Sequence, residues 1–120
     1  MSREVKFRAK VLNTNNWIYR QPFHIRGTWY MYNQLWDMVP IEHKTIGQFS
    51  GLLDIKGNQI YDGDLLKDDE NFIWEVCYKQ GMFYAKCDDL LALQMLSTVN
   101  LYGVVVGNTF DNPELLEVAQ

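Results

Sequence analysis

The chain has 120 residues, of which 48% are hydrophobic and 14% aromatic, and its formal net charge at pH 7 is −4. This composition is typical of a folded protein with one compact domain over residues 1–120, or with two small lobes of about 1–48 and 49–120. The acidic balance disfavours binding of nucleic acid by the whole protein, because that role needs a basic face. There is no signal-peptide pattern and no apolar run long enough to span a membrane, so we expect a cytoplasmic protein with reduced thiols and no membrane partner.

The opening segment REVKFRAKV alternates polar and apolar residues with a period of two, which predicts a strand. Its inward side chains are expected to be Val5, Phe7, Ala9 and Val11. Its charged side chains are expected on the solvent-exposed face, with a local basic edge as the alternative; they are Arg3, Lys6, Arg8 and Lys10. The amides of residues 13–16 then predict a turn, and Trp17 starts a second strand that ends at Pro22.

The segment from His24 to Val39 is rich in aromatic rings, with Gly27 near its start. We expect strands near 23–26 and 28–32, joined tightly at this glycine. Pro40 should interrupt the chain again, because proline lacks the N–H that a ladder needs, and a short strand should follow over Thr45–Phe49. The rings could form a stacking platform for single strands or sugars, but core or subunit contact is the favoured interpretation.

The stretch GLLDIKGNQIYDGDLLKDD, residues 51–69, combines three glycines with many carboxylates and amides. It fails as an EF-hand loop, because the sixth position is Gln59 when counted from Asp54 and Lys67 when counted from Asp62. It also lacks the Lys-Ser/Thr pair that follows a phosphate-binding loop. We therefore interpret it as two tight turns that bracket a short strand.

A weaker alternative for this stretch is metal binding by the carboxylates of Asp62 and Asp64. On a strand these two side chains would point to the same side and could hold a divalent ion weakly. Two carboxylates alone do not make a selective site. The sequence thus predicts no metal site and no cofactor.

The C-terminal half continues with a charged loop over 67–71 and a hairpin formed by Phe72–Tyr78 and Met82–Cys87, which turns at Gln80-Gly81. The leucine spacing makes Asp88–Val99 the one helical candidate of this part of the chain, with a short amphipathic turn or two and Asp88 as the candidate N-cap. A β-branched strand from Tyr102 to Val106 ends at Gly107. A last helical turn then begins at Pro113, with Asn112 as its N-cap. Strands outnumber helices, so the predicted fold class is mainly β, with a barrel or sandwich architecture and one or two short helices.

Other residues with chemical potential lack the partners that chemistry needs. His24 and His43 have no carboxylate or cysteine at metal-ligand spacing, and Ser50 and Ser97 lie in no nucleophile elbow. Cys77 and Cys87 form no CxxC motif; both thiols could lie on the same sheet face, but small buried side chains are the favoured interpretation. We therefore expect no catalytic residues.

Three segments of the chain together carry a family resemblance: REVKFRA at the start, FSGLLDIKGNQIYDGDLL in the middle and VVVGNTFDNPELLE near the end. Their order resembles the YopX family, whose members are small proteins found mainly in bacterial phages, prophages and related mobile elements. The departures are Lys10 where the family usually has Trp, Ser50 for Thr and Asp62 for Glu. The resemblance implies a largely β fold, an origin in a mobile element and self-assembly, but it supplies no reaction.

The residues that match this family have the chemistry of turns, because glycine permits a left-handed or closely packed backbone and short carboxylates and amides can accept hydrogen bonds from turn amides. We expect such a structural role for Gly51, Gly57, Gly63, Asp64, Gly107, Asn108 and Pro113. A protein whose motifs are turns is better suited to binding or assembly than to catalysis. The sequence thus predicts a non-enzymatic, self-assembling binding module with a host or phage protein as partner. A small nucleic-acid-associated β protein is the alternative.

Overall fold

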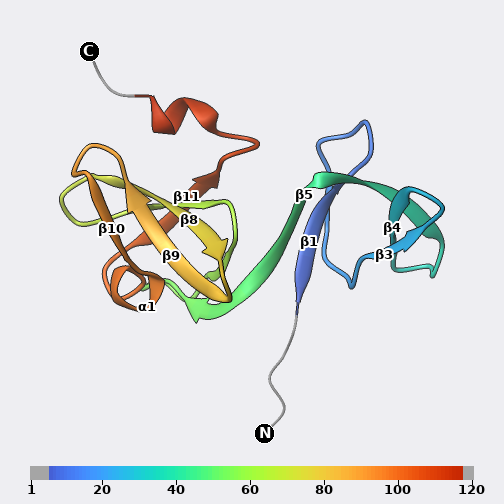
Figure 1. Ribbon diagram of the computed structural model, residues 1–120, viewed down its shortest axis with the longest axis horizontal. Coiled ribbons are helices and arrows are strands. Elements are labelled where there is room, and N and C mark those ends of the chain that lie inside the picture. Colours follow the sequence, from blue (N-terminus) through green and yellow to red (C-terminus); the bar gives the residue numbers. More distant parts are fainter. Residues whose placement is uncertain (1–5, 118–120) are drawn as a thin grey trace, which may run out of the picture. The chain divides into compact units, whose positions relative to one another are not determined.

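The computed structural model describes residues 6–117, and within them the protein is mainly β, as the sequence predicts (Figure 1). The chain divides into two compact units, which we call the first unit (Met1–Phe49) and the second unit (Ser50–Gln120). The strands form two antiparallel sheets, and the long strand β5 (Met38–Leu53) contributes residues to both units. The predicted positions of Arg3 and Val5 lie outside the described residues.

In the first unit, β5 is flanked by β1 (Phe7–Val11) and β2 (Trp17–Ile18) on one side and by β4 (Thr28–Tyr32) and β3 (Phe23–Ile25) on the other. The hairpins expected on either side of residues 13–16 and of Gly27 are confirmed. Arg26 and Gly27 have φ angles of 49° and 88°, a pair of left-handed residues whose twist matches that of the strands they join. One face of this sheet buries a small apolar cluster made of Ala9, Met31 and Ile41, with Phe7, Ile18, Trp29 and Ile46 packed against it.

The expected interruption at Pro40 is wrong, and so is the separate strand over 45–49, because β5 runs unbroken through both. Pro40 pairs with Tyr30, and its carbonyl accepts a hydrogen bond from the Leu12 N–H at 3.0 Å. A proline cannot donate to a ladder, but its carbonyl still serves as an acceptor. After Pro40 along β5, the pairing with β1 shifts register between Arg8 and Lys10. At this irregularity the Thr45 hydroxyl accepts a hydrogen bond from the Lys10 N–H at 2.8 Å.

The second unit contains β6 (Gln59–Tyr61), which pairs with β5, and a five-stranded sheet in the order β10-β9-β8-β7-β11. Its strands are β7 (Asp64–Lys67), β8 (Ile73–Lys79), β9 (Met82–Cys87), β10 (Ala92–Met95) and β11 (Val104–Asn108). The predicted hairpin over residues 72–87 is confirmed, and Gln80 and Gly81 again have positive φ angles, of 53° and 80°. The core of this unit consists of Ile60, Leu66, Trp74, Val76, Ala85, Cys87, Leu96 and Val99.

The short helix expected within 88–99 is present only at the C-terminal end of this range. Residues 92–95 form strand β10 against β9, and only α1 (Leu96–Val99) is helical. Asp88 is not an N-cap; it starts a turn in which Leu91 has a φ of 49°. Apolar residues every second or third position fit a strand as well as a helix, and pairing with β9 decides between them. The last helical turn is present as η1 (Pro113–Leu116), a 3-10 turn whose preceding residue Asn112 makes no capping hydrogen bond.

Candidate functional site: two sheet faces on a turn scaffold

The corner at residues 51–69 contains the left-handed glycines that its composition suggests. Gly51, Gly57 and Gly63 have φ angles of 84°, 86° and 92°. Two turns bracket β6, as expected, and the buried Asp64 carboxylate accepts a hydrogen bond from the Tyr61 N–H at 2.7 Å. Asp64 therefore serves the backbone of the turn, which is the role that the sequence assigned to it.

Two further carboxylates at this corner serve the backbone, and the sequence reasoning missed both. Asp54 accepts hydrogen bonds from the N–H groups of Lys56 and Asn58 on one oxygen, and from the Asn58 side chain and the Val105 N–H on the other, all at 2.8–3.0 Å. Burial raises the pKa of the Asp54 carboxyl, but these hydrogen bonds outweigh burial and hold that pKa below its usual value. Asp54 thereby ties the corner to β11.

The second missed carboxylate, Asp68, closes the loop between β7 and β8. One oxygen accepts from the N–H groups of Glu70 and Phe72, and the other from the indole N–H of Trp74, each at 2.9 Å. Asp68 is 8% exposed and Trp74 is 2% exposed, so this bond satisfies a buried donor. The signal available in the sequence was the spacing, because an Asp or Asn followed three residues later by Gly or Asn is typical of such loops.

The last predicted motif lies between β11 and η1. A Cβ added to Gly107 would lie 2.4 Å from the Asn112 Oδ1 atom, so this glycine permits a close approach. Asn108 accepts from the N–H groups of Phe110 and Asp111 at 3.0 and 2.9 Å, and Pro113 is the first residue of η1. These residues shape the chain rather than line a pocket.

The candidate metal ligands Asp62 and Asp64 do not share a strand. Asp62 lies in the turn after β6 and not on a strand, so the argument that its carboxylate shares a side with Asp64 fails. In residues 6–117 no group of three or more His, Cys, Asp and Glu side chains has the arrangement that a metal ion needs. His24 packs against the Trp29 ring, with centroids 5.0 Å apart, and His43 is exposed on β5.

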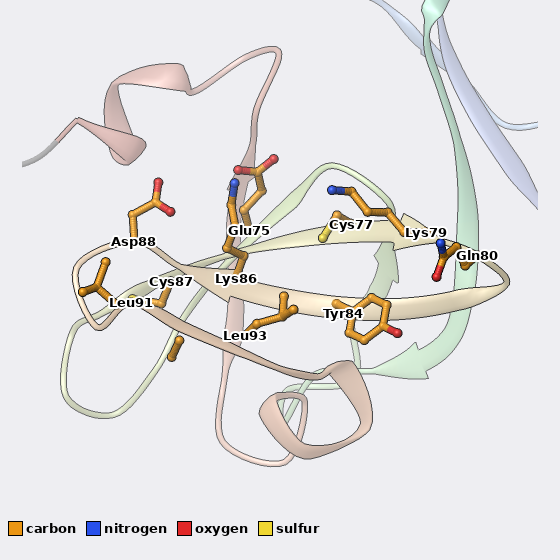
Figure 2. A pocket seen from close by; sticks show the side chains of 11 residues that line it. Glu75, Cys77, Lys79, Gln80, Tyr84, Lys86, Cys87, Asp88, Leu91 and Leu93 are labelled. Atoms are coloured by element: carbon orange, nitrogen blue, oxygen red, sulfur yellow. The ribbon is translucent and has the colours of Figure 1, made fainter.

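A hollow of about 870 Å³ lies over β8, β9 and β10 of the second unit (Figure 2). Cross-strand pairs set its floor: Glu75 lies opposite Lys86, which lies opposite Leu93, and Cys77 lies opposite Tyr84. The floor is therefore apolar in the middle, with charged side chains of both signs around it. A surface of this kind can bind another molecule.

The two thiols lie on opposite faces of this sheet, so the suggestion that they share a face is wrong. Cys87 belongs to the buried core, whereas Cys77 is half-buried in the hollow, because strand register places it opposite Tyr84. Burial, together with the neighbouring Glu75 carboxylate, raises the pKa of the Cys77 thiol. The thiol therefore stays protonated near neutral pH, which suits a packing role and not a nucleophile.

The second candidate surface is the sheet face of the first unit that points away from its apolar cluster. Arg8 and Lys10 both lie over the Trp17 ring, at 4.7 and 5.6 Å from its centroid. Arg8 is only 7% exposed, so the expectation that it lies on a solvent-exposed face is wrong: it packs against the ring instead. On the same face, Phe23 stacks on Tyr30 and Tyr32, with centroids 5.8 and 4.9 Å apart.

Comparison with known proteins bears on the family to which the chain belongs. In the described residues no helix is long and apolar enough to cross a membrane. No curated protein matches the chain. Within residues 6–117, the three sequence segments that carry the resemblance lie in the turns and strands of the two units. The sequence model of the YopX protein family matches residues 6–117. The chain therefore belongs to the YopX family.

Proposed function

We propose that this protein is a non-enzymatic binding module that self-associates through the second unit. The observation that supports the proposal is the edge of the five-stranded sheet: among residues 6–117, β10 has a strand partner on one side only, and it borders the hollow. Its side chains Leu93 and Met95 are 63% and 41% exposed, and Leu91 beside it is 94% exposed. An open edge without lysine, proline or a bulge is a template for pairing with another chain.

A second copy of the same chain fits this edge. Two β10 strands can pair antiparallel around a twofold axis, because such an edge offers the same donors and acceptors to its copy. This pairing would extend the sheet and bring the apolar side chains of both copies together. Lys86, Glu75 and the other charged groups of the hollow would then lie at the rim, where charges are tolerated.

The role as a binder rather than an enzyme rests on the positions of the acidic groups. Asp54, Asp64 and Asp68 all accept hydrogen bonds from the backbone of turns. Carboxylates occupied in this way stabilise the scaffold and do not face a substrate. The proposal also includes a phage or prophage origin, action in the cytoplasm of the bacterial host, and a host or phage protein as a further partner. The resemblance to mobile-element proteins motivates these points, and the genes that flank its coding sequence would test the origin.

Sedimentation equilibrium of the purified protein tests the self-association. We expect a dimer at micromolar concentrations and a dissociation constant that rises at least about tenfold in Leu93→Lys, because a charge at the edge opposes pairing. The matched control is Leu35→Lys, at a position that is 80% exposed in the first unit, and it should leave the dimer unchanged. A wild-type protein that stays monomeric at about 100 µM, well above the range expected of a specific dimer, would contradict the proposal.

A further inference from the structure

The charges of this protein are divided unequally between its two units. Residues 1–49 contain seven Lys and Arg against three Asp and Glu, a formal charge of +4. Residues 50–120 contain four against twelve, a formal charge of −8. The net charge of −4 that disfavours nucleic acid for the whole chain is therefore the sum of a basic first unit and a strongly acidic second unit. A strong charge difference between two halves indicates an anionic partner for the basic half.

Two basic residues of the first unit, Arg8 and Lys10, share a face with aromatic rings. Cross-strand partners lie on the same side of a sheet. On one side of β5 the partners connect Phe23 with Tyr30, Tyr30 with Pro40, and Tyr32 with Met38. On its other side Lys10 is the partner of both Trp17 and Glu42. Positions 38, 40 and 42 alternate along β5, so all these side chains project from one face. The opposite face carries the apolar cluster of Ala9, Met31 and Ile41.

The rings at one end of this face are open to solvent. Trp36 is 68% exposed, Tyr19 is 55% exposed and Tyr32 is 38% exposed. The Arg20 guanidinium lies over the Trp36 ring at 5.1 Å, and the centroids of Tyr32 and Trp36 are 5.9 Å apart. A hollow of about 570 Å³ adjoins them, lined by Trp17, Tyr19, Arg20 and Tyr32 with residues of β1 and of the loop after β4.

We propose that this aromatic and basic face of the first unit binds single-stranded nucleic acid. Exposed rings stack on unpaired bases whatever the sequence, and Arg20 and Lys10 supply the positive charge that attracts the phosphates. In a duplex the bases are paired and stacked on one another, so they cannot stack on these rings. An acidic peptide could contact the cations, but it has no bases to stack on the rings. The combination of both groups on one face favours a single strand. This inference is independent of the dimer proposed above, which uses the second unit.

Fluorescence anisotropy with a labelled oligothymidylate or oligouridylate of about 20 nucleotides tests the inference, at roughly 50 mM salt where phosphate contacts are strongest. We expect binding that weakens as salt rises. Trp36→Ala and Arg20→Ala should each raise the dissociation constant about fivefold or more, as the loss of one stacked base does. Arg20→Ala should also lower the slope of log affinity against log salt by about 0.7, because one phosphate contact is lost.

Matched controls come from the second unit, where Tyr78→Ala removes a ring that is 42% exposed and Lys79→Ala removes one positive charge. Both variants should bind as the wild type does. Poly-glutamate and a duplex of the same length serve as competitors and should displace the single strand only weakly. The inference is overturned by an absence of binding at roughly 50 mM salt, by equal competition from either polymer, or by control variants that weaken binding as much as Trp36→Ala.

Discussion

Replacing Asp54 by Asn separates the two roles of this carboxylate, which are to accept hydrogen bonds within its own turn and to accept one from β11. The amide oxygen can still accept from the N–H groups of Lys56 and Asn58, as the side chain of Asn33 does in an equivalent loop. The new NH₂ group, however, faces two donors, the Asn58 side chain at 3.0 Å and the Val105 N–H at 2.8 Å. The exposed Asn58 amide can turn to water, whereas the half-buried Val105 N–H loses its acceptor.

The expected cost follows from this single lost acceptor. A hydrogen bond to a charged group contributes about 1.5–3 kcal/mol, so we expect Asp54→Asn to lower the free energy of unfolding by about 2 kcal/mol. Urea denaturation followed by circular dichroism measures the loss, and amide hydrogen exchange should show reduced protection of Val105. Asp69→Asn, which removes an exposed carboxylate in the next loop, should change stability by no more than about 0.5 kcal/mol. A loss below that value for Asp54→Asn would refute the assignment of Asp54 as the tie to β11.

Three further predictions concern the same unit. Because the pKa of Asp54 is lowered in the folded protein, the stabilising contribution of this carboxylate is present above the unfolded value of about 3.8 and is lost as the pH falls below that value. Urea titrations between pH 6 and 2.5 should therefore show that Asp54→Asn loses less unfolding free energy on acidification than the wild type does. Gly63→Val should cost more than about 1 kcal/mol, since φ at this position is 92°; an unchanged melting temperature would show that the turn tolerates a side chain. Trp74→Ala should cost about 3 kcal/mol or more, because it empties a core position and leaves Asp68 without its indole donor; ready quenching of the wild-type Trp74 fluorescence by iodide would contradict its burial.

The hairpins could be predicted from the sequence because their signals are local. Arg26-Gly27 and Gln80-Gly81 each provide a pair of left-handed residues between two runs of strand-forming residues, and both turns are where the sequence indicates them. The same holds for Gly57 and Gly63 at the corner after β5. In each case the glycine alone is enough to place the turn.

The remaining elements depend on contacts that the sequence does not show. Residues 92–95 form β10 because β9 offers them a partner, although their leucine spacing also fits a helix. Pro40 stays inside β5 because β4 pairs with it and Leu12 donates to its carbonyl. Tertiary pairing thus overrides local preference at both positions.

Within residues 6–117 one loop geometry occurs three times, and two of these loops carry a signal in the sequence. Asn33, Asp54 and Asp68 each accept from the N–H groups two and four residues later. The residue three positions later is left-handed in every case: Trp36, Gly57 and Asn71, with φ angles of 64°, 86° and 70°. Gly57 and Asn71 are residues that favour this conformation, so the loops at 54 and 68 could have been predicted. A tryptophan gives no such signal.

The left-handed conformation of Trp36 links this scaffold to the proposed binding face. The loop that begins at Asn33 holds Trp36 at the end of β4, where Tyr32 lies 5.9 Å away and the Arg20 guanidinium lies over the indole. A bulky residue with a φ of 64° is strained, and it stays there because the loop closes through four hydrogen bonds around it. The net charge of the whole chain gives no indication of this basic face, because most of the acidic residues that make the net charge negative belong to residues 50–120. Charge therefore becomes informative about a partner only after the two units have been separated, and for the first unit it then agrees with the exposed rings.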